Sequence, residues 1–245
     1  MLLLLPPSET KRDGGIDGSA LDLDVLSFTA LTPLRKPVIS ELKRLSRSVG
    51  ASMAGLSLGP TQRFEVDRNR ALLSSAVMPA IDRYTGVLYD ALDVGTLAPA
   101  AREFAEEHLV IHSALFGLVR GRDPIPAYRL SHDSRMPGLS LRRHWREAVT
   151  AALEAQDQLI LDLRSDSYAA LGPAPDSVQA VRVVSEDTHG RRVALSHVNK
   201  SGKGLFARAV AEAGMDHACV ESLIAWTEAS GIRLERTEAG LDLIP

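Results

Sequence analysis

A loop with arginine and tyrosine holds the first residues whose types could do chemistry. Within 115–130 an apolar run ends at Arg120, Asp123 follows, and Tyr128-Arg129 closes the segment. Guanidinium groups present a planar fork that binds phosphate or carboxylate, and a tyrosine adds a stacking face and a hydroxyl. Prolines in the loop lower the entropy lost on binding. The pattern favours an anion site, and the alternative is that Arg120 or Arg129 pairs with Asp123 and only holds the loop.

A second polar group follows a predicted strand at 158–163, in the run Ser165-Asp166-Ser167-Tyr168. At the end of a strand, Asp166 and Tyr168 would be buried and would face a cleft, with Asp166 as a general acid or base. The structural alternative is that Ser165 or Asp166 caps the first turn of a short helix. Local sequence favours the cap over catalysis.

Basic residues cluster between a predicted strand at 192–198 and a predicted helix at 201–213, and include Lys200, Lys203 and Arg208. Free N–H groups at a helix start, beside two lysines, form an anion site. The glycine spacing of a P-loop is absent, which argues against ATP hydrolysis. We therefore predict phosphate binding here, against the alternative of a solvated turn.

An aliphatic strand at 2–5 leads into a polar run that ends in Lys11. Lys11 or Lys203 could act as a nucleophile or as a phosphate ligand, with Asp166 as general acid or base. The candidate catalytic residues are Lys11, Asp123, Asp166 and Tyr168. The candidate DNA or phosphate contacts are Arg120, Tyr128, Arg129, Lys200, Lys203 and Arg208.

The histidines and the cysteine do not favour a metal centre. His108 and His112 flank a predicted strand, which would place them roughly 13 Å apart at ~3.3 Å per residue. His217 and Cys219 have no partner pair nearby, so a zinc site is not predicted. We expect no metal and no cofactor.

The elements that must position these groups alternate irregularly between helix and strand. Helices are predicted over 37–49, 96–107, 139–155, 201–213 and 216–229. Strands are predicted over 2–5, 109–111, 158–163, 178–185, 192–198, 232–236 and 241–244, with a hairpin turn at 187–190. This order, without a linker rich in proline or glycine, predicts one α+β domain over 1–245, with a central mixed sheet flanked by helices.

Composition narrows the class of protein. The chain has 245 residues, 45% of them hydrophobic, which is enough for a sizeable core. One cysteine excludes an internal disulfide and suits a reducing compartment, and no apolar run approaches the ~18–20 residues of a membrane span. The formal net charge of −3 at pH 7 does not suggest nucleic acid. Basic segments at 120–146 and 191–208, however, could converge into a local anion-binding surface.

Taken together, motifs spread over nearly the whole chain resemble those of the bacterial YaaA family of peroxide-stress resistance proteins. The motifs are the run from Pro6-Pro7-Ser8 to Lys11, Tyr84-Thr85-Gly86, the run from Ser113 to Arg120 with Asp123, Pro126-Ala127-Tyr128-Arg129-Leu130, Trp145, Asp162 to Tyr168, and Lys203-Gly204 with Arg208. The sequence departs from the usual pattern at Glu9, Arg122, Ser131-His132 and Gly202-Lys203.

The resemblance implies a cytoplasmic protein that limits damage from unincorporated iron during peroxide stress. It also implies a fold peculiar to the family, with a helix-hairpin-helix-like element and a positively charged cleft that binds double-stranded DNA. The positions carried over are Tyr84, Arg120, Asp123, Tyr128, Arg129, Asp166, Tyr168, Lys203 and Arg208.

Two classes of function remain open from the residues. The first is a protective protein that binds double-stranded DNA through its basic segments. The second is an enzyme that acts on a nucleotide, a nucleobase or damaged DNA, because carboxylate, tyrosine, arginine and lysine occur together at strand ends. A module that binds iron or a partner without catalysis ranks last, since no ligand set for a metal is present.

Overall fold

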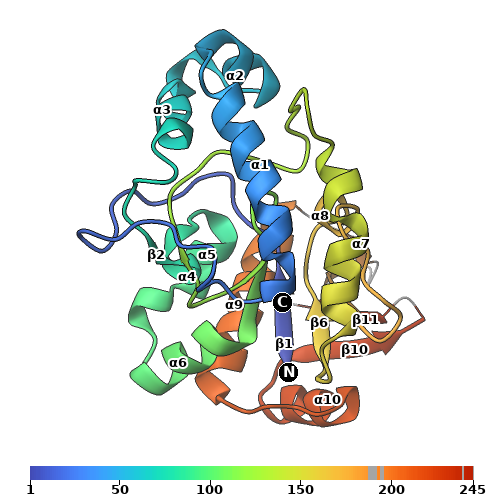
Figure 1. Ribbon diagram of the computed structural model, residues 1–245. Helices are drawn as coiled ribbons and strands as arrows, with labels where there is room; N and C mark the ends of the chain where they lie inside the picture. Colours follow the sequence, from blue (N-terminus) through green and yellow to red (C-terminus); the bar gives the residue numbers. More distant parts are fainter. Residues whose placement is uncertain (187–191, 194–195, 239, 245) are drawn as a thin grey trace.

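A seven-stranded mixed sheet forms the centre of the computed structural model, which describes residues 1–186, 192–193, 196–238 and 240–244 (Figure 1). Its strands follow the order β10 (Arg233–Thr237), β11 (Gly240–Ile244), β7 (Gln179–Val183), β6 (Ile160–Asp162), β1 (Leu2–Leu5), β3 (Leu109–Ser113) and β4 (Gly117–Arg120). Strand β1 runs parallel to both neighbours, with Leu3 paired to Leu109 and to Leu161. Its four residues are all buried, as expected for a strand covered on both faces.

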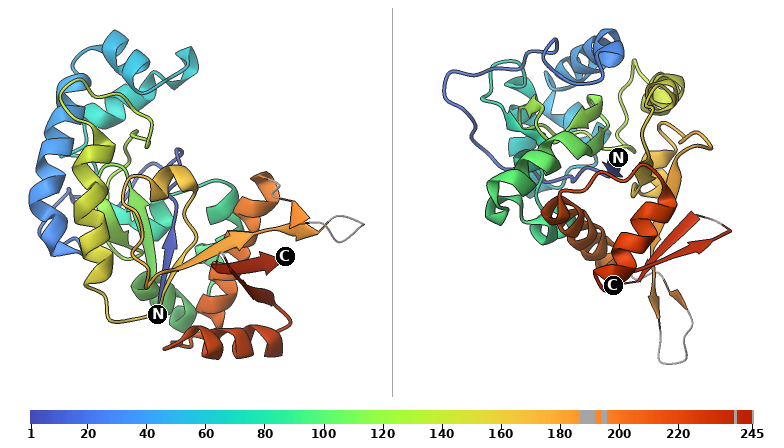
Figure 2. Two further views of the ribbon diagram at one scale, coloured as in Figure 1. Left: turned by 90° about the vertical axis from the view of Figure 1, so that its right-hand side faces the viewer. Right: turned by 90° about the horizontal axis from the view of Figure 1, so that it is seen from below.

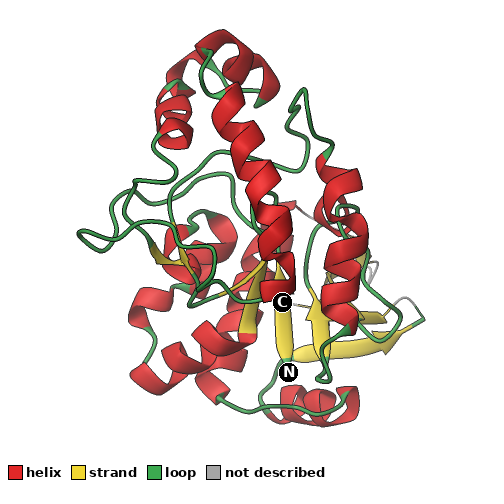
Figure 3. Ribbon diagram, in the orientation of Figure 1, coloured by secondary structure: helices red, strands yellow, loops and turns green. Residues whose placement is uncertain are grey.

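Helices cover both faces of this sheet (Figure 3). Figure 2 shows α1 and α7 on one side of the strands and α9 on the other. The helices are α1 (Thr32–Leu45), α2 (Val49–Gly55), α3 (Phe64–Arg70), α4 (Ala80–Arg83), α5 (Val87–Leu92), α6 (Pro99–His108), α7 (Leu141–Glu154), α8 (Asp166–Ala169), α9 (Ser196–Ala213) and α10 (Val220–Ala229). In the part of the chain that is described, none of them has the length and apolar character to cross a membrane.

Two short antiparallel pairs complete the described structure. Strand β2 (Met78–Pro79) pairs with β5 (Pro124–Ile125), which ties the proline loop to the segment before α4. Strand β8 (Ser185–Glu186) pairs with β9 (Arg192–Val193). The predicted hairpin turn at 187–190 lies outside the described residues.

Helix α7 shows how the sequence pattern becomes packing. The hydroxyl of Ser140 accepts a hydrogen bond from the backbone N–H of Arg143 and caps the first turn. Apolar side chains at helical spacing face the core, and Trp145 is fully buried, with its Nε1 donating to the carbonyl of Ala114 at 2.9 Å. The indole therefore fills the core.

The α+β class with a mixed sheet flanked by helices is confirmed, and so are most of the predicted strands. The predicted helix at 37–49 begins earlier in the structure, because α1 starts at Thr32 with Pro33 in its first turn, and 49 already opens α2. The helix-hairpin-helix-like element stays a prediction.

The predicted strand at 192–198 is wrong from Ser196 on, where α9 begins, while residues 194–195 lie outside the described residues. A short alternation of apolar and polar residues fits a strand or a helix, and in the structure this segment is part of helix α9 from Ser196 on. Lys200 and Lys203 consequently lie inside a helix, and the predicted anion site at a helix start is absent from this segment.

Helices α5 and α9 pack with their backbones in unusually close approach. A Cβ atom at Gly204 would lie 2.1 Å from the carbonyl oxygen of Leu88 and 2.8 Å from the Cβ of Ala91. Only glycine fits between the helices at this distance. The contact brings Lys200 and Lys203 to the same edge of the sheet as the start of α5.

The Gly204→Ala substitution should therefore lower the free energy of unfolding by about 1–3 kcal/mol, because the added methyl group overpacks the helix contact. Denaturant titration followed by circular dichroism measures this. Gly50→Ala is the matched control: Gly50 lies in α2 with open space around its Cβ position, so alanine there should be neutral or stabilise by about 0.5–1 kcal/mol. Equal effects at both positions would contradict the close-packing argument.

Candidate functional site

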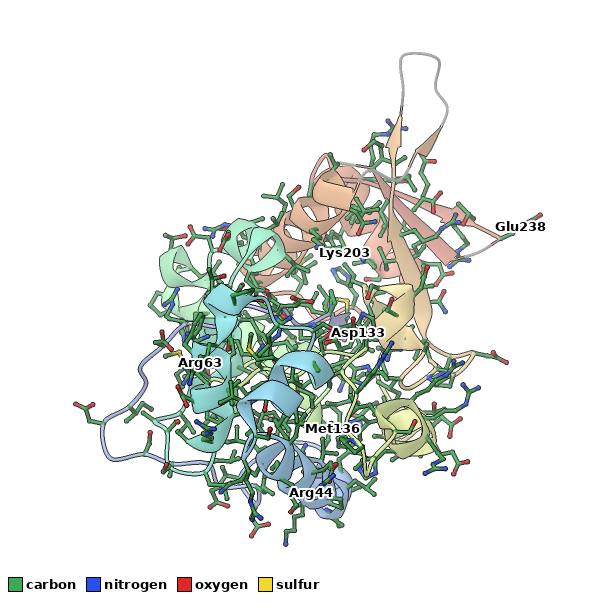
Figure 4. All side chains as sticks on the ribbon, turned by 90° about the horizontal axis from the view of Figure 1, so that it is seen from above. Arg44, Arg63, Asp133, Met136, Lys203 and Glu238 are labelled. Atoms are coloured by element: carbon green, nitrogen blue, oxygen red, sulfur yellow. The ribbon has the colours of Figure 1, made fainter. Side chains whose placement is uncertain are left out.

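A pocket of about 640 Å³ opens where β1 and β6 end, at the edge of a parallel sheet where ligands commonly bind. Figure 4 looks down on this edge and shows Lys203 and Asp133 near the middle of the view. The lining residues come from the segment after β1, the start of α5, the loop after Leu130, the start of α8 and the first half of α9. They are Pro6, Pro7, Ser8, Glu9, Thr10, Thr85, Gly86, Val87, Leu88, Tyr89, Ser131, His132, Ser165, Tyr168, Asn199, Lys200 and Lys203.

Three hydroxyl groups form one rim of the pocket. Thr85 donates to the Oγ1 of Thr10 at 2.9 Å, and that oxygen lies 3.2 Å from the Oγ of Ser8. Gly86 has a φ of 96°, and a Cβ there would lie 3.4 Å from the same Ser8 oxygen. The backbone at 85–86 can approach this closely because glycine adopts the left-handed conformation without strain.

Lys11 lies directly beneath that rim and does not line the pocket. Its Nζ donates to the carbonyls of Ser8 at 2.9 Å and Glu9 at 3.1 Å, and it lies 4.3 Å from the ring centroid of Tyr128. Burial lowers the pKa of Lys11 to about 7, partly opposed by the Glu65 carboxylate. In this arrangement the amine stabilises the loop at 6–10.

A buried chain of hydroxyls extends below Lys11. The phenol oxygen of Tyr128 lies 2.8 Å from that of Tyr84 and 2.7 Å from the Oγ of Ser113. Burial raises the pKa of both phenols, so each remains neutral and can donate a hydrogen bond. The chain connects the segment before α5 to the end of β3.

Arg129 is held rigidly next to this chain. The side chain of Asn69 accepts from the Arg129 backbone N–H at 2.8 Å and donates to its carbonyl at 2.9 Å. The guanidinium is buried, and its Nη2 pairs with the Oε2 of Glu9 at 2.7 Å. Its Nε has no hydrogen-bond partner.

Two lysines of α9 supply positive charge to the opposite wall. Lys200 is exposed, whereas Lys203 is only 6% exposed and its Nζ lies 3.4 Å from the carbonyl oxygen of Arg164. Burial lowers the pKa of Lys203, and the carboxylates of Asp162 and Asp166 partly offset that effect. Both ammonium groups therefore lie where an anionic ligand would enter.

A buried polar network supports the wall that Tyr168 forms. Arg164 pairs with Asp162 at 2.7 Å and donates to the Nδ1 of His112 at 2.9 Å. Because Nδ1 accepts, the neutral imidazole carries its proton on Nε2, which has no partner. Burial and the Arg164 charge both lower the pKa of His112. The Tyr168 ring contacts this imidazole edge-on and also that of His132.

Several predicted site residues therefore gather at one place. Lys203, Lys200 and Tyr168 line the pocket, and Lys11, Tyr84, Tyr128 and Arg129 lie beneath it.

Asp166 does not line the pocket, contrary to the prediction that it faces a cleft. It opens α8 and is exposed, so the prediction of a buried acid there is wrong. The bend after β6 turns its side chain outward, while Tyr168, two residues on, turns inward.

The remaining predicted residues are part of the scaffold. Asp123 is buried and accepts from the Ser27 hydroxyl at 2.7 Å and from the Arg120 backbone N–H at 3.0 Å. The alternative in which Asp123 forms an ion pair with the side chain of Arg120 or Arg129 is wrong, because Arg120 pairs with Glu107 and Arg129 with Glu9.

Arg208 is likewise occupied away from the pocket. It pairs with Glu212 at 2.9 Å and donates to the carbonyl of Asp93 at 2.9 Å. It thereby links α9 to the turn after α5, and it lines neither the pocket nor the adjoining groove.

Sequence reasoning missed other lining residues as functional candidates, among them Ser8, Thr10, Thr85, His132, Ser165 and Asn199. Most belong to the motifs quoted above or adjoin them. A usable signal was the placement of small hydroxyl residues directly after apolar runs.

A shallower groove of about 470 Å³ shares His132 with the pocket. It runs along the loop at 132–140 to the start of α7, and its lining includes Arg135, Arg142 and Arg143. The three arginines are exposed. The described surface therefore carries positive charge on both sides of His132.

We predicted no metal site at His108 and His112 because an extended strand from one to the other would hold them too far apart. His108 instead ends α6, and its Nδ1 contacts the carbonyl of Met1 at 2.7 Å. Within the described ranges, no group of three or more His, Cys, Asp or Glu side chains could hold a metal ion.

Comparison with known proteins gives consistent matches over the chain. The sequence profile of a family described as peroxide stress protein YaaA matches residues 1–236. A UPF0246 protein of Corynebacterium glutamicum (strain R) is 42% identical over 240 residues, which is 96% of this chain and 95% of the relative. A UPF0246 protein of Corynebacterium efficiens is 46% identical over 216 residues, or 86% and 85% of the two chains. One of Streptomyces coelicolor is 42% identical over 224 residues, or 87% and 84%.

The buried Lys11 predicts a pH-dependent stability difference. Its pKa falls from 10.5 to about 7 on folding, so between these values the unfolded chain binds more protons and wild-type stability rises with pH. The Lys11→Met variant lacks this dependence, so its free energy of unfolding compares best with that of the wild type below pH 7. Between pH 7 and pH 10.5 the wild type should gain a few kcal/mol over the variant, at about 1.4 kcal/mol per pKa unit.

Denaturant titrations of both proteins across this range measure the difference. Lys36→Met, which removes an exposed lysine from α1, is the control, and Lys11→Met should show the larger change with pH. Equal changes in the two variants would contradict the burial of a titrating amine at Lys11.

Proposed function

This chain belongs to the YaaA family of peroxide stress proteins, and we propose that it protects DNA during peroxide stress by binding the double helix through its pocket and groove. The observation that carries the proposal is the convergence of cations at one edge of the sheet. Lys200 and Lys203 line the pocket, while Arg135, Arg142 and Arg143 line the adjoining groove.

The local charge supports a polyanionic partner despite the negative total. Among the lining residues of pocket and groove, Glu9 is the one acid, and its charge is paired with Arg129. A concave surface with one sign of charge raises the local concentration of an oppositely charged partner. Phosphates spaced along a duplex offer contacts to both the groove and the pocket mouth.

Protection from iron would follow indirectly from such binding. No cluster of metal ligands is present among the described residues, so the proposal assigns no iron site to the protein. A protein seated on the phosphates competes with iron bound to them, and oxidants then form further from the bases. Tight stoichiometric iron binding by the purified protein would contradict this account.

A second candidate is an enzyme, or a binding protein, for a single nucleotide. The pocket has the volume of a small-molecule site, and it combines the Tyr168 ring and the Pro6-Pro7 surface with the Lys203 ammonium. A nucleobase fits against the apolar side and a phosphate against the lysine. Asp166, the general acid or base predicted for such an enzyme, is exposed, and its charge acts on Lys203.

The DNA proposal is tested by fluorescence anisotropy of a labelled duplex across a salt series. If about four cations engage phosphates, the slope of log affinity against log salt is near −3.6, and removing one contact changes it by about 0.9. Lys200→Gln should reduce both affinity and slope. Lys36→Gln removes the same charge from the exposed face of α1 and should leave the slope unchanged. Salt-independent binding, or equal losses in both variants, would contradict the proposal.

The nucleotide candidate is tested by calorimetric titration with deoxyadenosine monophosphate. Lys203→Gln should weaken binding by about tenfold or more, because a charge-assisted hydrogen bond to phosphate is lost. Lys200→Gln, at the exposed mouth, should weaken it less. If the wild type does not bind the mononucleotide, the second candidate is eliminated while the DNA proposal stands.

A further inference from the structure

Arg129 is a buried cation whose hydrogen-bonding capacity is only partly used. Its side chain is 7% exposed, it pairs with Glu9, and its Nε–H has no partner. Burying a charged donor without a partner is costly, and a guanidinium presents several donors in one plane. Such a group is poised to accept a ligand with more oxygens than one carboxylate supplies.

The position of Arg129 does not depend on its ion pair. Asn69 bonds both its backbone N–H and its carbonyl, and Asn69 is itself fully buried. These two bonds fix the Arg129 backbone, and the burial of its side chain, which is 7% exposed, limits the movement of the guanidinium when Glu9 leaves. A pre-positioned cation loses little entropy when it binds an anion.

Glu9 has the opposite character. Its side chain is 63% exposed, and it is the one acid among the residues that line the pocket. The exposed carboxylate loses little when it moves into solvent. The buried guanidinium stays paired only if another anion takes the place of Glu9. Carboxylate and phosphate both present paired oxygens to an arginine fork, and one can replace the other.

We infer that the Glu9 carboxylate occupies a phosphoryl subsite of the pocket, and that Arg129 binds the phosphoryl group of the ligand after Glu9 turns away. The inference rests on the proposed function for the chemistry of the ligand, whose phosphoryl group belongs to the DNA backbone or to a free nucleotide. Glu9 thus competes with the ligand. The hydroxyl rim and Lys203 lie on the same pocket surface and can contact the remaining oxygens.

The decisive experiment measures affinity for two probes, a labelled DNA duplex and deoxyadenosine monophosphate. Glu9→Gln should raise affinity by about two- to fivefold, the range of an ion pair with one exposed partner. Asp166→Asn is the matched control, because it removes an exposed acid whose charge also acts on the pocket through Lys203. If Glu9→Gln raises affinity only as much as Asp166→Asn does, the loss of a negative charge near the pocket explains the increase, and the inference is overturned.

Arg129 variants show whether the gain passes through the guanidinium. Arg129→Gln should lower affinity by at least about tenfold, and in that background Glu9→Gln should give no more than the control. Arg129→Lys keeps the charge but not the fork, so it should also lose most of the Glu9 effect. Thermal denaturation verifies that each variant is folded. A full Glu9→Gln gain in both Arg129 backgrounds would overturn the inference.

The two probes also separate this inference from the proposed function. A gain on the duplex identifies a backbone phosphate, and a gain on the mononucleotide alone identifies a free nucleotide. Salt-steep duplex binding that is indifferent to Glu9→Gln, together with an unchanged affinity for the mononucleotide, leaves the proposed function standing and refutes the subsite. Binding of neither probe by any variant refutes both.

Discussion

The Lys11 ammonium, placed between two backbone carbonyls and the face of Tyr128, is the interaction on which the pocket depends. Burial of the Lys11 amine lowers its pKa to about 7, and residues 6–10 turn back over it so that two backbone carbonyls accept its hydrogen bonds. That turn carries Ser8, Glu9 and Thr10 to the rim. The hydrogen bonds from Lys11 to the carbonyls of Ser8 and Glu9 stabilise the turn of the segment after β1.

Two further constraints complete the arrangement around that turn. Close contact at Gly204 allows α9 to present Lys200 and Lys203 against the start of α5. The hydroxyl chain from Tyr84 through Tyr128 to Ser113 links the rim to the end of β3. Charge, hydroxyls and an apolar wall therefore meet through packing between short motifs that lie far apart in the sequence.

Local patterns predicted the strands well, because buried β1, β3 and β6 are short apolar runs with no helical alternative of similar length. They failed at α9, where a brief alternation before Ser196 suggested a strand. The site was predictable only in part. Lys203 and Arg129 reach it, whereas Arg120 and Arg208 are engaged by Glu107 and Glu212. Which carboxylate meets which guanidinium is decided by tertiary packing, and single-sequence reasoning has no access to that.

The position of β1 in the sheet has a consequence for synthesis of the chain. Leu3 lies in register with Leu109 and Leu161, so β1 is synthesised long before either of its neighbours. At roughly 5–20 residues per second, that interval is on the order of ten seconds. During it, an aliphatic segment with unpaired backbone groups is available to any other nascent strand. The segment at 2–5 can complete its pairing in the native sheet only after residues 109–111 and 160–162 have been synthesised.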